Sequence, residues 1–507
     1  MEIIVVGGFM LHNKRKIILA FVIICLIGLV GLGISYAYWK FTYIQTDNNI
    51  AISKCLKLEM SNESNAINLD NMYPISDEEG KKLTPYSFKI TNTCSMSAEY
   101  KVNLEMLEGT TLNSKYLASL VNNGDIKLLS SYDSTKTTIS GSVESRTLDT
   151  NILTPGASKE YSISLWMDKS VTLADDAQNK SFSAKVVIDA VMSTKTIQDM
   201  IIAQLDTAGK CPTVNDDGTV NVTSAESENA LLCSAPDNYG TSYYYRGNVS
   251  NNYVKFAGFY WRIVRINGDG SVRMIYDGTS AHANGEASED RIIGTSAFNE
   301  QYDDNAYVGY MYGTPGSSTY EETHANINDS TIKKYVDTWY ENNINDAMIE
   351  QYIADNIFCN DRSFSENNSG TGTGKIVTKY RWGVWKSSAM MLKCLQNNDA
   401  FSVYNFNYGN GDLTYSIGLI TTDEAVLAGG WSNPHSNYYL YTGSGYWTLS
   451  VADFPGSSAF VTDVTYDGAP VSSANVNRSF GVKPVINLKP NSLKLGDGTI
   501  NNPYTIE

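Results

Sequence analysis

Cysteines are the residues of this chain whose type and spacing could most readily do chemistry. Of the seven, Cys25 lies in an apolar run from Ile17 to Ile34, and the others form couples by position: Cys55 with Cys94, Cys211 with Cys233, and Cys359 with Cys394. Sequence alone leaves the connectivity open, and we prefer these local pairings because each couple falls within one candidate unit. A metal site is the alternative, but there is no C-x-x-C and no histidine is spaced with the cysteines. We therefore predict disulfides within these couples.

Recognised catalytic motifs are absent from the sequence. The segment Gly370–Lys375, GTGTGK, is similar to a phosphate-binding loop, but Ser369 and Ile376 stand where that loop needs Gly and Ser or Thr. The chain contains neither G-x-S-x-G nor H-E-x-x-H. His435 lies in GGWSNPHSNYY, which is typical of a surface loop. We therefore expect no enzyme activity and assign no catalytic or cofactor-binding residue.

The charge of the chain restricts its partners. Its net charge is −16, its pI is about 4.8, and Lys and Arg do not cluster beyond the N-terminal region, which argues against nucleic-acid binding. Acidic pairs at Asp175–Asp176, Asp216–Asp217 and Asp303–Asp304 could contribute to calcium sites, which need several oxygen ligands. A solvated acidic surface is the simpler interpretation. No cofactor is predicted, and calcium is kept as the weaker alternative.

Residues 14–39 predict export. Cations at Lys14–Lys16 precede the apolar run Ile17–Ile34, and this order holds the preceding end in the cytoplasm. The run lies between a long signal peptide and a short membrane span. We favour an anchor because aromatic residues follow it, as at membrane interfaces, with 1–13 as a cytoplasmic stub. The expected location is the cell membrane with the bulk extracellular, or secretion if the segment is cleaved.

Residues 42–193 predict an antiparallel β-sandwich. Short segments such as YSFKITNT and KEYSISLWMD alternate polar with apolar residues, and turns such as LTPGAS separate them. TPYSFKITNTCSMSAEYKVNLEML and LTPGASKEYSISLWMD, together with SYAYW at the export boundary, resemble the camelysin and biofilm-fibre type of sandwich of Gram-positive cells. That resemblance implies a sandwich close to the membrane.

Residues 194–210 predict a helical connector, and the pattern changes after it. VKFAGFYWRIVRI and SVRMIYDG flank NGDG at Asn267–Gly270, a strong hairpin signal. DSTIKKYVDTWYENN predicts a helix whose buried stripe is Ile332, Tyr335, Val336 and Trp339, capped by Asp329 or Ser330. TTDEAVLAGG predicts a short helix with a capping box of Thr421 and Glu424. Residues 211–507 therefore predict an α+β domain.

That domain carries a second resemblance. FAGFYWRIVRINGDGSVRMIYDG, FCNDRS, IGLITTDEAVLAGG, YYLYTGSGYWTLS, FGVKPVINLK and GDGTINNPY resemble, in this order, uncharacterised exported domains of Gram-positive bacteria. Their layout is similar to the formylglycine-generating enzyme and C-type-lectin-like fold. The formylglycine enzymes use a cysteine pair near the end of their core, whereas the last cysteine here is Cys394. Since fold does not determine function, the resemblance implies a lectin-like architecture without that activity.

Aromatic clusters suggest a ligand face in that domain. In lectin-like folds, loops rich in aromatic, Asn and Asp residues form the recognition surface; filling of an irregular core is the alternative. The candidate ligand-face residues are Tyr307, Tyr310, Tyr312, Trp431, Tyr438 and Tyr439. We expect a cell-surface binding or adhesion protein with carbohydrate or protein partners. The alternatives are a structural subunit of a surface or biofilm fibre and a divergent enzyme on a formylglycine-generating-type scaffold.

Overall fold

The chain divides into two compact units, Met1–Lys195 and Thr196–Glu507. The first consists mainly of strands, as predicted, and the second, predicted as an α+β domain, combines strands with a smaller number of helices in its described residues. The computed structural model describes residues 40–44, 50–52, 56–60, 67–70, 72–94, 96–122, 124–193, 195–222, 230–383, 389–431, 436–470 and 472–506. Within these ranges, none of the helices combines the length and apolarity needed to cross a bilayer. The predicted membrane or signal segment 14–39 lies outside the described residues.

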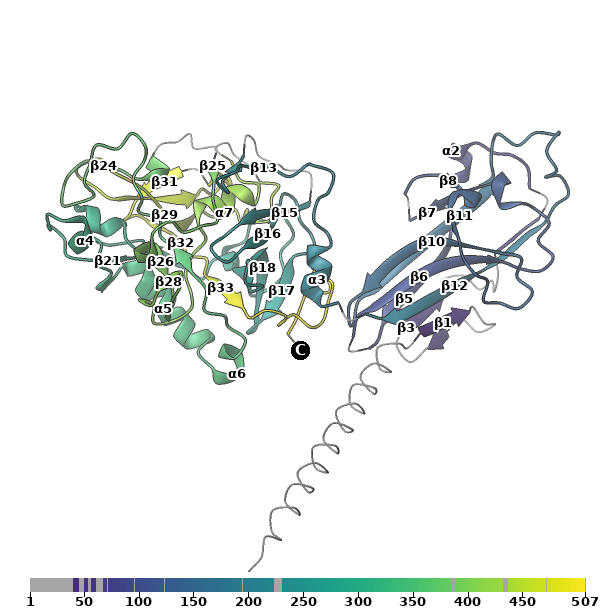
Figure 1. The fold of residues 1–507 in the computed structure, drawn as a ribbon, viewed down its shortest axis with the longest axis horizontal. Helices are drawn as coiled ribbons and strands as arrows, with labels where there is room; N and C mark the ends of the chain where they lie inside the picture. Colours follow the sequence, from purple (N-terminus) through teal and green to yellow (C-terminus); the bar gives the residue numbers. More distant parts are fainter. Residues whose placement is uncertain are drawn as a thin grey trace, which may run out of the picture. The chain divides into compact units, whose positions relative to one another are not determined.

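The first unit consists of two antiparallel sheets of six strands each (Figure 1). One sheet has the order β1 (Lys40–Ile44), β12 (Phe182–Met192), β6 (Ala98–Met106), β10 (Glu144–Leu153), β9 (Asp133–Ser134), with β4 (Ile67–Leu69) beside β12. The other has the order β2 (Ile50–Ile52), β3 (Leu56–Met60), β5 (Tyr86–Asn92), β11 (Ser158–Met167), β7 (Leu117–Val121), β8 (Lys127–Leu128). Both sheets contribute to one hydrophobic core.

Alternation of side chains places that core between the sheets. On β5, Tyr86, Phe88 and Ile90 are buried, while Ser87 and Lys89 between them are half-buried. Because successive side chains of a strand point to opposite faces, one face of each sheet can be apolar and the other solvated. The period-two pattern in the sequence therefore has a direct structural counterpart.

A hydrogen bond joins the two sheets inside the core. The hydroxyl groups of Tyr100 on β6 and Tyr161 on β11 lie 2.8 Å apart. Tyr161 also donates to Oδ2 of Asp149 on β10, at 2.6 Å. Burial raises the pKa of Tyr161 far above its ordinary value, so the hydroxyl stays protonated as a donor. Two buried hydroxyls thus satisfy each other instead of remaining desolvated and unpaired.

Helix α2 (Asp77–Gly80) covers an aromatic ring on the outer face of the second sheet. A capping box of Ser76 and Glu79 begins the helix. A Cβ atom at Gly80 would lie 2.4 Å from the Trp166 ring, so only glycine allows this approach. Trp166 is consequently buried, at 2% exposed, although its position on β11 faces away from the core.

The second unit contains two six-stranded sheets and several smaller ones. The first has the order β15 (Leu231–Pro236), β16 (Thr241–Arg246), β18 (Phe259–Ile266), β19 (Val272–Gly278), β33 (Val485–Leu488), with β17 (Tyr253–Phe256) beside β18. The second has the order β20 (Thr295–Ala297), β32 (Ser479–Gly481), β29 (Tyr446–Phe454), β30 (Phe460–Val464), β31 (Ser472–Asn475), with β24 (Thr378–Lys379) beside β29. Only the β29–β32 pair is parallel among the described strands.

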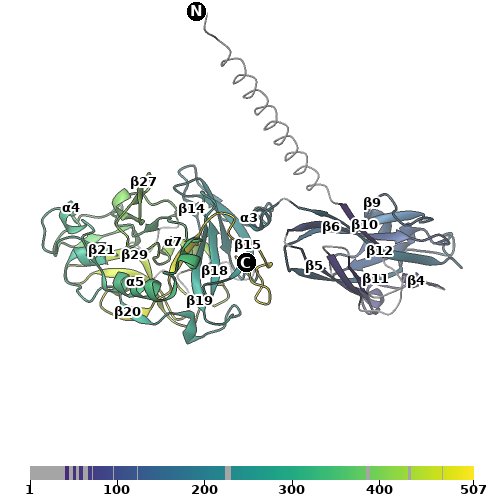
Figure 2. The same ribbon diagram turned by 90° about the horizontal axis from the view of Figure 1, so that it is seen from below.

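The smaller sheets join short segments of two or three strands. They are β13 (Thr213–Val214), β14 (Val220–Asn221) and β25 (Ala389–Met390); β21 (Met311–Tyr312) and β22 (Asn328–Asp329); β23 (Phe358–Cys359) and β26 (Ala400–Phe401); and β27 (Asn405–Phe406) and β28 (Gly409–Asn410). Figure 2 shows β27 at the rim of the unit. The predicted hairpin at Asn267–Gly270 is confirmed, because β18 and β19 pair there.

Short helices complete the unit: α3 (Ile197–Ile202), α4 (Tyr320–Thr323), α5 (Thr331–Asn343), α6 (Ala347–Glu350) and α7 (Thr422–Leu427). Ser330 caps α5, and Ile332 and Val336 are fully buried, but Tyr335 is exposed. The predicted capping box of Thr421 and Glu424 is present in α7. Helix α3, within the predicted connector 194–210, buries Ile197 and Ile201 in the core of the second unit.

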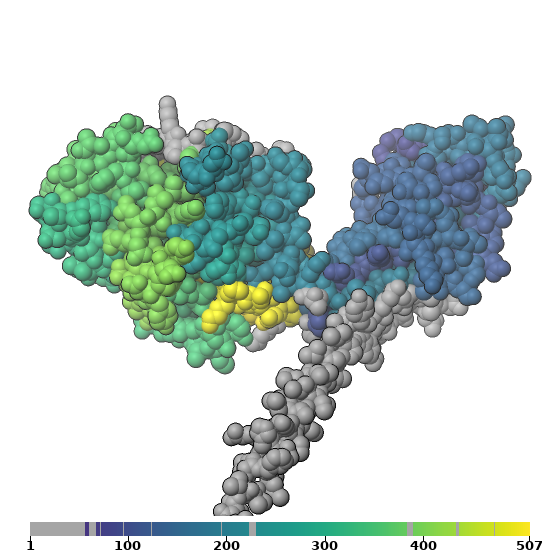
Figure 3. All heavy atoms as spheres, viewed as in Figure 1, coloured from purple at the N-terminus to yellow at the C-terminus, as the bar shows by residue number. Residues whose placement is uncertain are grey.

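Segments far apart in the sequence form one surface in the second unit. In Figure 3, the yellow C-terminal segment lies against teal residues of the early strands, and Val254 bridges to Tyr504. Strand β33 pairs with β19 in the same sheet, with Val272 opposite Leu488. The C-terminal segment is therefore an integral part of the fold.

Candidate functional site

The structure contains two of the predicted disulfides, Cys211–Cys233 and Cys359–Cys394. Cys94 is disulfide-bonded as well, and its expected partner Cys55 lies outside the described residues. Within the described part of the chain, every cysteine is therefore oxidised. A thiol-based activity would require a reduced cysteine.

The predicted ligand-face residues do not form one surface. Tyr310, Tyr438 and Tyr439 are fully buried, so the assignment of these three to a ligand face is wrong. They fill the core of an irregular domain that has few helices, which was the alternative interpretation. Tyr307 and Tyr312 are half-buried neighbours with ring centroids 5.3 Å apart. Trp431 is half-buried against a separate small cluster.

A member of each acidic pair forms hydrogen bonds or an ion pair with a neighbouring side chain. Asp175 accepts hydrogen bonds from Thr172, Asp217 accepts from Thr219, and Asp303 pairs with Lys375 at 2.9 Å. Within the described ranges, no group of three or more possible metal-binding side chains comes together. Lys375 belongs to the GTGTGK segment. Because its side chain and that of Asp303 are both exposed, their contact is a surface ion pair. His435 lies outside the described residues.

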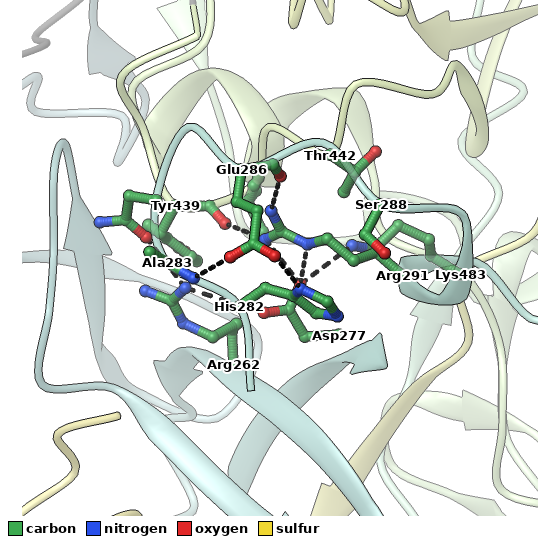
Figure 4. Close-up of polar contacts among 12 residues, drawn as sticks. Arg262, Asp277, His282, Ala283, Glu286, Ser288, Arg291, Tyr439, Thr442 and Lys483 are labelled. Carbon is green, nitrogen blue, oxygen red and sulfur yellow. Dashed lines mark hydrogen bonds and ion pairs between the residues drawn. The ribbon is translucent and has the colours of Figure 1, made fainter. Parts of the chain in front are cut away.

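A buried charged cluster surrounds Asp277 at the end of β19 (Figure 4). Oδ1 of Asp277 accepts from Nε and Nη2 of Arg291 at 2.9 and 2.8 Å, and Nζ of Lys483 lies 3.5 Å from it. Arg262 approaches Oδ2 at 3.8 Å. These side chains are all at most 1% exposed. Burial lowers the pKa of Lys483 to about 7, against the opposing effect of Asp277.

His282 lies beside this cluster (Figure 4). Its contacts with Glu286 and Ser280 invite comparison with a nucleophile–base–acid triad. Its Nδ1 is 2.9 Å from Oε1 of Glu286, and Oγ of Ser280 is 3.4 Å from its Nε2. However, Oδ1 of Asp290 contacts the same Nε2 at 2.7 Å. Burial raises the pKa of Asp290, but hydrogen bonds from Ser288 and His282 hold it well below its usual range. Because the ionised carboxylate of Asp290 already contacts Nε2 of His282, that nitrogen is not available as a base for Ser280. The geometry therefore fits a structural role for His282.

A second charged cluster borders a small cavity of about 20 Å³. Arg265 bridges Asp237 at 2.8 Å and Glu424 at 3.0 Å, and Arg273 contacts Glu424 at 2.6 Å. Burial raises the pKa of Glu424, but the two guanidinium groups hold it below its ordinary value. Cys359 also lines this cavity. Its size suits a water molecule, and the ion pairs around it satisfy each other.

An open groove of about 580 Å³ lies along β32. Its lining residues are Glu289, Ile292, Gly294, Thr295, Ser444, Gly445, Ser479, Phe480 and Gly481. The Phe480 ring rests against Trp447, with centroids 4.9 Å apart, and the Arg478 guanidinium lies 5.3 Å above it. The volume is in the range of small-ligand sites, but Arg478 and Trp447 already contact the aromatic ring.

A group of exposed and half-buried aromatic residues lies at the β27–β28 hairpin. Tyr404 is 70% exposed, Tyr408 is 41% exposed, and Phe406 is half-buried between them. Tyr239 contacts the last two rings, with centroids 5.3 Å from Tyr408 and 6.5 Å from Phe406. We call Tyr239, Tyr404, Phe406 and Tyr408 the aromatic hairpin surface. Because Phe406 and Tyr408 both contact Tyr239, their rings lie on one side of the hairpin.

Polar contacts hold the base of this hairpin. Oδ1 and Oδ2 of Asp355 accept from the backbone N–H groups of Val403 and Tyr404 at 3.0 and 2.8 Å. Ser402 donates to the Tyr404 carbonyl at 2.8 Å. Burial raises the pKa of Asp355, against the effect of these hydrogen bonds. A Cβ atom at Gly409 would lie 2.2 Å from the Ser402 hydroxyl oxygen, so the hairpin closes only with glycine there.

The Cys359–Cys394 disulfide lies next to the hairpin base. Strand β23 pairs with β26, with Cys359 opposite Ala400. Tyr239 and Phe406 pack against the small hydrophobic cluster that contains Cys394 and Ala400. The disulfide therefore constrains the part of the unit against which Tyr239 and Phe406 pack.

Sequence interpretation did not identify this surface, although a signal exists. In Tyr404–Asn410, YNFNYGN, aromatic residues alternate with Asn and end at a glycine. Strand-like alternation followed by Gly favours a short hairpin, and large aromatic residues in it have few neighbours to cover them.

No family model, curated protein or solved structure matches this chain.

Proposed function

We propose that this chain is a cell-surface binding or adhesion protein. Residues 14–39 would anchor it in the membrane or direct its secretion. The second unit, a C-type-lectin-like α+β module, would recognise carbohydrate or protein through its loops. Disulfides in both units support an oxidising, extracellular location, because such bonds persist outside the cytosol.

The aromatic hairpin surface is the observation that carries this proposal. Tyr404 is 70% exposed, so its ring is available for contact with a ligand. Tyrosine provides a large contact area and a hydroxyl group at a low entropic cost, which is why it is abundant in binding loops. The hairpin base is held by Asp355 and by the nearby disulfide, so little ordering is required on binding.

A glycan and peptide array probed with the full chain in detergent tests the proposal. We expect binding that falls at least tenfold in Tyr404→Ala and stays unchanged in Tyr466→Ala. Tyr466 is a matched control because it is 71% exposed but lies in the turn between β30 and β31. Silence of the intact protein towards every glycan and peptide, with and without calcium, would contradict the proposal.

A fibre subunit is the second candidate, and one observation in the first unit favours it. Strand β10 pairs with β6 as far as Leu153, but on its other side the described pairing partners reach only Arg146 and Thr147. An open strand edge can accept a strand from another chain. Assembly of purified protein into fibres, seen by electron microscopy, would support this function.

The remaining alternative is a divergent enzyme on the formylglycine-generating-type scaffold. That chemistry depends on reactive cysteines, and the described cysteines are in disulfides. A free-thiol assay on native protein distinguishes the two cases: two reactive thiols would favour the enzyme, and none would favour the binding protein.

A further inference from the structure

We infer that the aromatic hairpin surface binds an uncharged glycan chain. This inference rests on the proposed function and deepens it by naming the ligand class. The observations that carry it are the exposure of the rings, the amides between them, the sign of the surrounding charge and the support beneath the hairpin.

The rings are arranged to receive flat, partly apolar ligand faces. The Tyr239 and Tyr408 rings meet edge to face, at 84°, so the edge of one ring lies over one face of the other. Tyr404 is 70% exposed and Tyr408 is 41% exposed. The C–H faces of a pyranose ring are apolar and match an aromatic face, while its edge carries hydroxyl groups. The exposed rings of Tyr404 and Tyr408 therefore suit contact with sugar units.

Amide side chains alternate with these rings. Asn405 and Asn407 are exposed, and Asn405 is paired across the hairpin with Asn410. An amide side chain offers both donors and an acceptor, as a sugar hydroxyl group does. Because successive side chains of a strand point to opposite faces, Asn407, in the turn between β27 and β28, is the amide that we expect to accompany the rings. A purely apolar protein partner would leave these amides without such partners.

Local charge argues for an uncharged ligand. The segment 402–412 contains no Lys or Arg, and its one ionisable side chain besides the tyrosines is Asp412. Asp355 lies beneath the hairpin, and burial together with Asp269 and Asp355 raises the pKa of the Tyr239 hydroxyl. The negative field at this surface disfavours sulfated or uronic-acid glycans and acidic peptides.

The hairpin is also prepared for binding before a ligand arrives. Asp355 holds two backbone N–H groups, and Gly411 donates to Ser402 at 3.2 Å. Asn410 donates to the Asn398 carbonyl at 3.1 Å, which ties the second strand to the body of the unit. Such a supported loop places its aromatic residues with little loss of entropy on binding.

The test measures binding of the full chain to immobilised neutral polysaccharides (β-glucan, mannan and N-acetylglucosamine polymers), to sulfated and uronic-acid glycans, and to peptides. We expect a neutral glycan to bind, with an affinity that changes less than about twofold between low and high salt, because no ion pair is screened. Tyr404→Ala and Asn407→Ala should each weaken it about tenfold, as expected for loss of one aromatic or hydrogen-bonding contact. Tyr404→Phe should keep most of the affinity, and Tyr466→Ala should keep all of it.

The outcomes separate this inference from the proposed function. Binding to peptides or to acidic glycans alone would overturn the ligand class and leave the binding function in place. Neutral-glycan binding that is unaffected in Tyr404→Ala would place the glycan elsewhere and overturn the assignment to the hairpin. Silence towards all probes would overturn both. The near-ultraviolet circular dichroism of each variant verifies that the fold is retained.

Discussion

The backbone N–H of Tyr404 donates a hydrogen bond of 2.8 Å to Oδ2 of Asp355, and the other carboxylate oxygen holds Val403. One carboxylate thus fixes the first strand of the aromatic hairpin at the point where its most exposed ring begins. The position of Tyr404 therefore depends on a half-buried residue that lies 49 positions away in the sequence.

We expect Asp355→Ala to loosen this hairpin. A hydrogen bond to a charged group contributes about 1.5–3 kcal/mol, so the loss of two should lower the local stability by about 2–4 kcal/mol, allowing for partial replacement by water. Hydrogen–deuterium exchange should become faster at Val403 and Tyr404 while the β18–β19 amides stay protected. Asp216→Ala, at an exposed turn, is the control. Unchanged exchange at the hairpin would show that Asp355 does not support it.

Asp463 should make the stability of the second unit depend on pH. It is 2% exposed on β30, and burial raises its pKa to about 6 from 3.8. Between these values the folded state holds the proton more tightly than the unfolded state, so the free energy of unfolding falls as pH rises, and the cost is complete above about pH 6.

Asp463→Asn should remove that cost. Since one pKa unit corresponds to about 1.4 kcal/mol, we expect a stabilisation of about 1–3 kcal/mol at pH 8 and almost none at pH 4. Urea unfolding at the two pH values measures the difference, with Asp412→Asn as an exposed control. An equal effect of Asp463→Asn at both pH values would exclude an ionisation origin.

The Cys359–Cys394 disulfide should stabilise both the second unit and the hairpin. The cysteines are 35 residues apart, and closing such a loop stabilises a fold by about 3–4 kcal/mol in the chain-entropy description. Cys359→Ala/Cys394→Ala should lower the urea midpoint accordingly and accelerate hydrogen exchange in 402–411. Cys211→Ala/Cys233→Ala, with a separation of 22, should cost a similar amount without affecting the hairpin. Equal exchange in the two variants would contradict the anchoring role.

Gly80→Ala tests the cover over Trp166 in the first unit. The added methyl group would lie 2.4 Å from the indole ring, so helix α2 must shift. Overpacking of this kind costs about 1–3 kcal/mol. The double variant Gly80→Ala/Trp166→Leu should recover part of that loss, because the smaller side chain vacates the space. Thermal unfolding of the four proteins measures the coupling, and strictly additive effects would argue against direct contact.

Local patterns in the sequence predicted local structure well. Thr421 and Glu424 are three residues apart and form the capping box that their spacing predicts. The hairpin of β18 and β19 follows from a turn flanked by apolar strands. In both cases the interacting residues are neighbours in the chain, so no knowledge of distant segments is required.

Burial of individual aromatic residues could not be predicted in the same way. Tyr438 and Tyr404 both lie in segments rich in Tyr and Asn, yet Tyr438 is completely buried and Tyr404 is 70% exposed. The difference arises from what lies against each segment, and those neighbours come from elsewhere in the chain. The Tyr438 hydroxyl, for example, donates to the carbonyl of Gly468. Composition alone, without these neighbours, could not distinguish the two segments.

The contact between Asp277 and Lys483 bears on the order in which the second unit folds. These residues are 206 positions apart, and strand β33, which completes the sheet through β19, follows directly after Lys483. A ribosome would have to synthesise and release the chain through Leu488 before that sheet could close. Folding of this sheet therefore waits for β33, and a chain that stalls short of that strand would offer an unfinished sheet to chaperones and proteases.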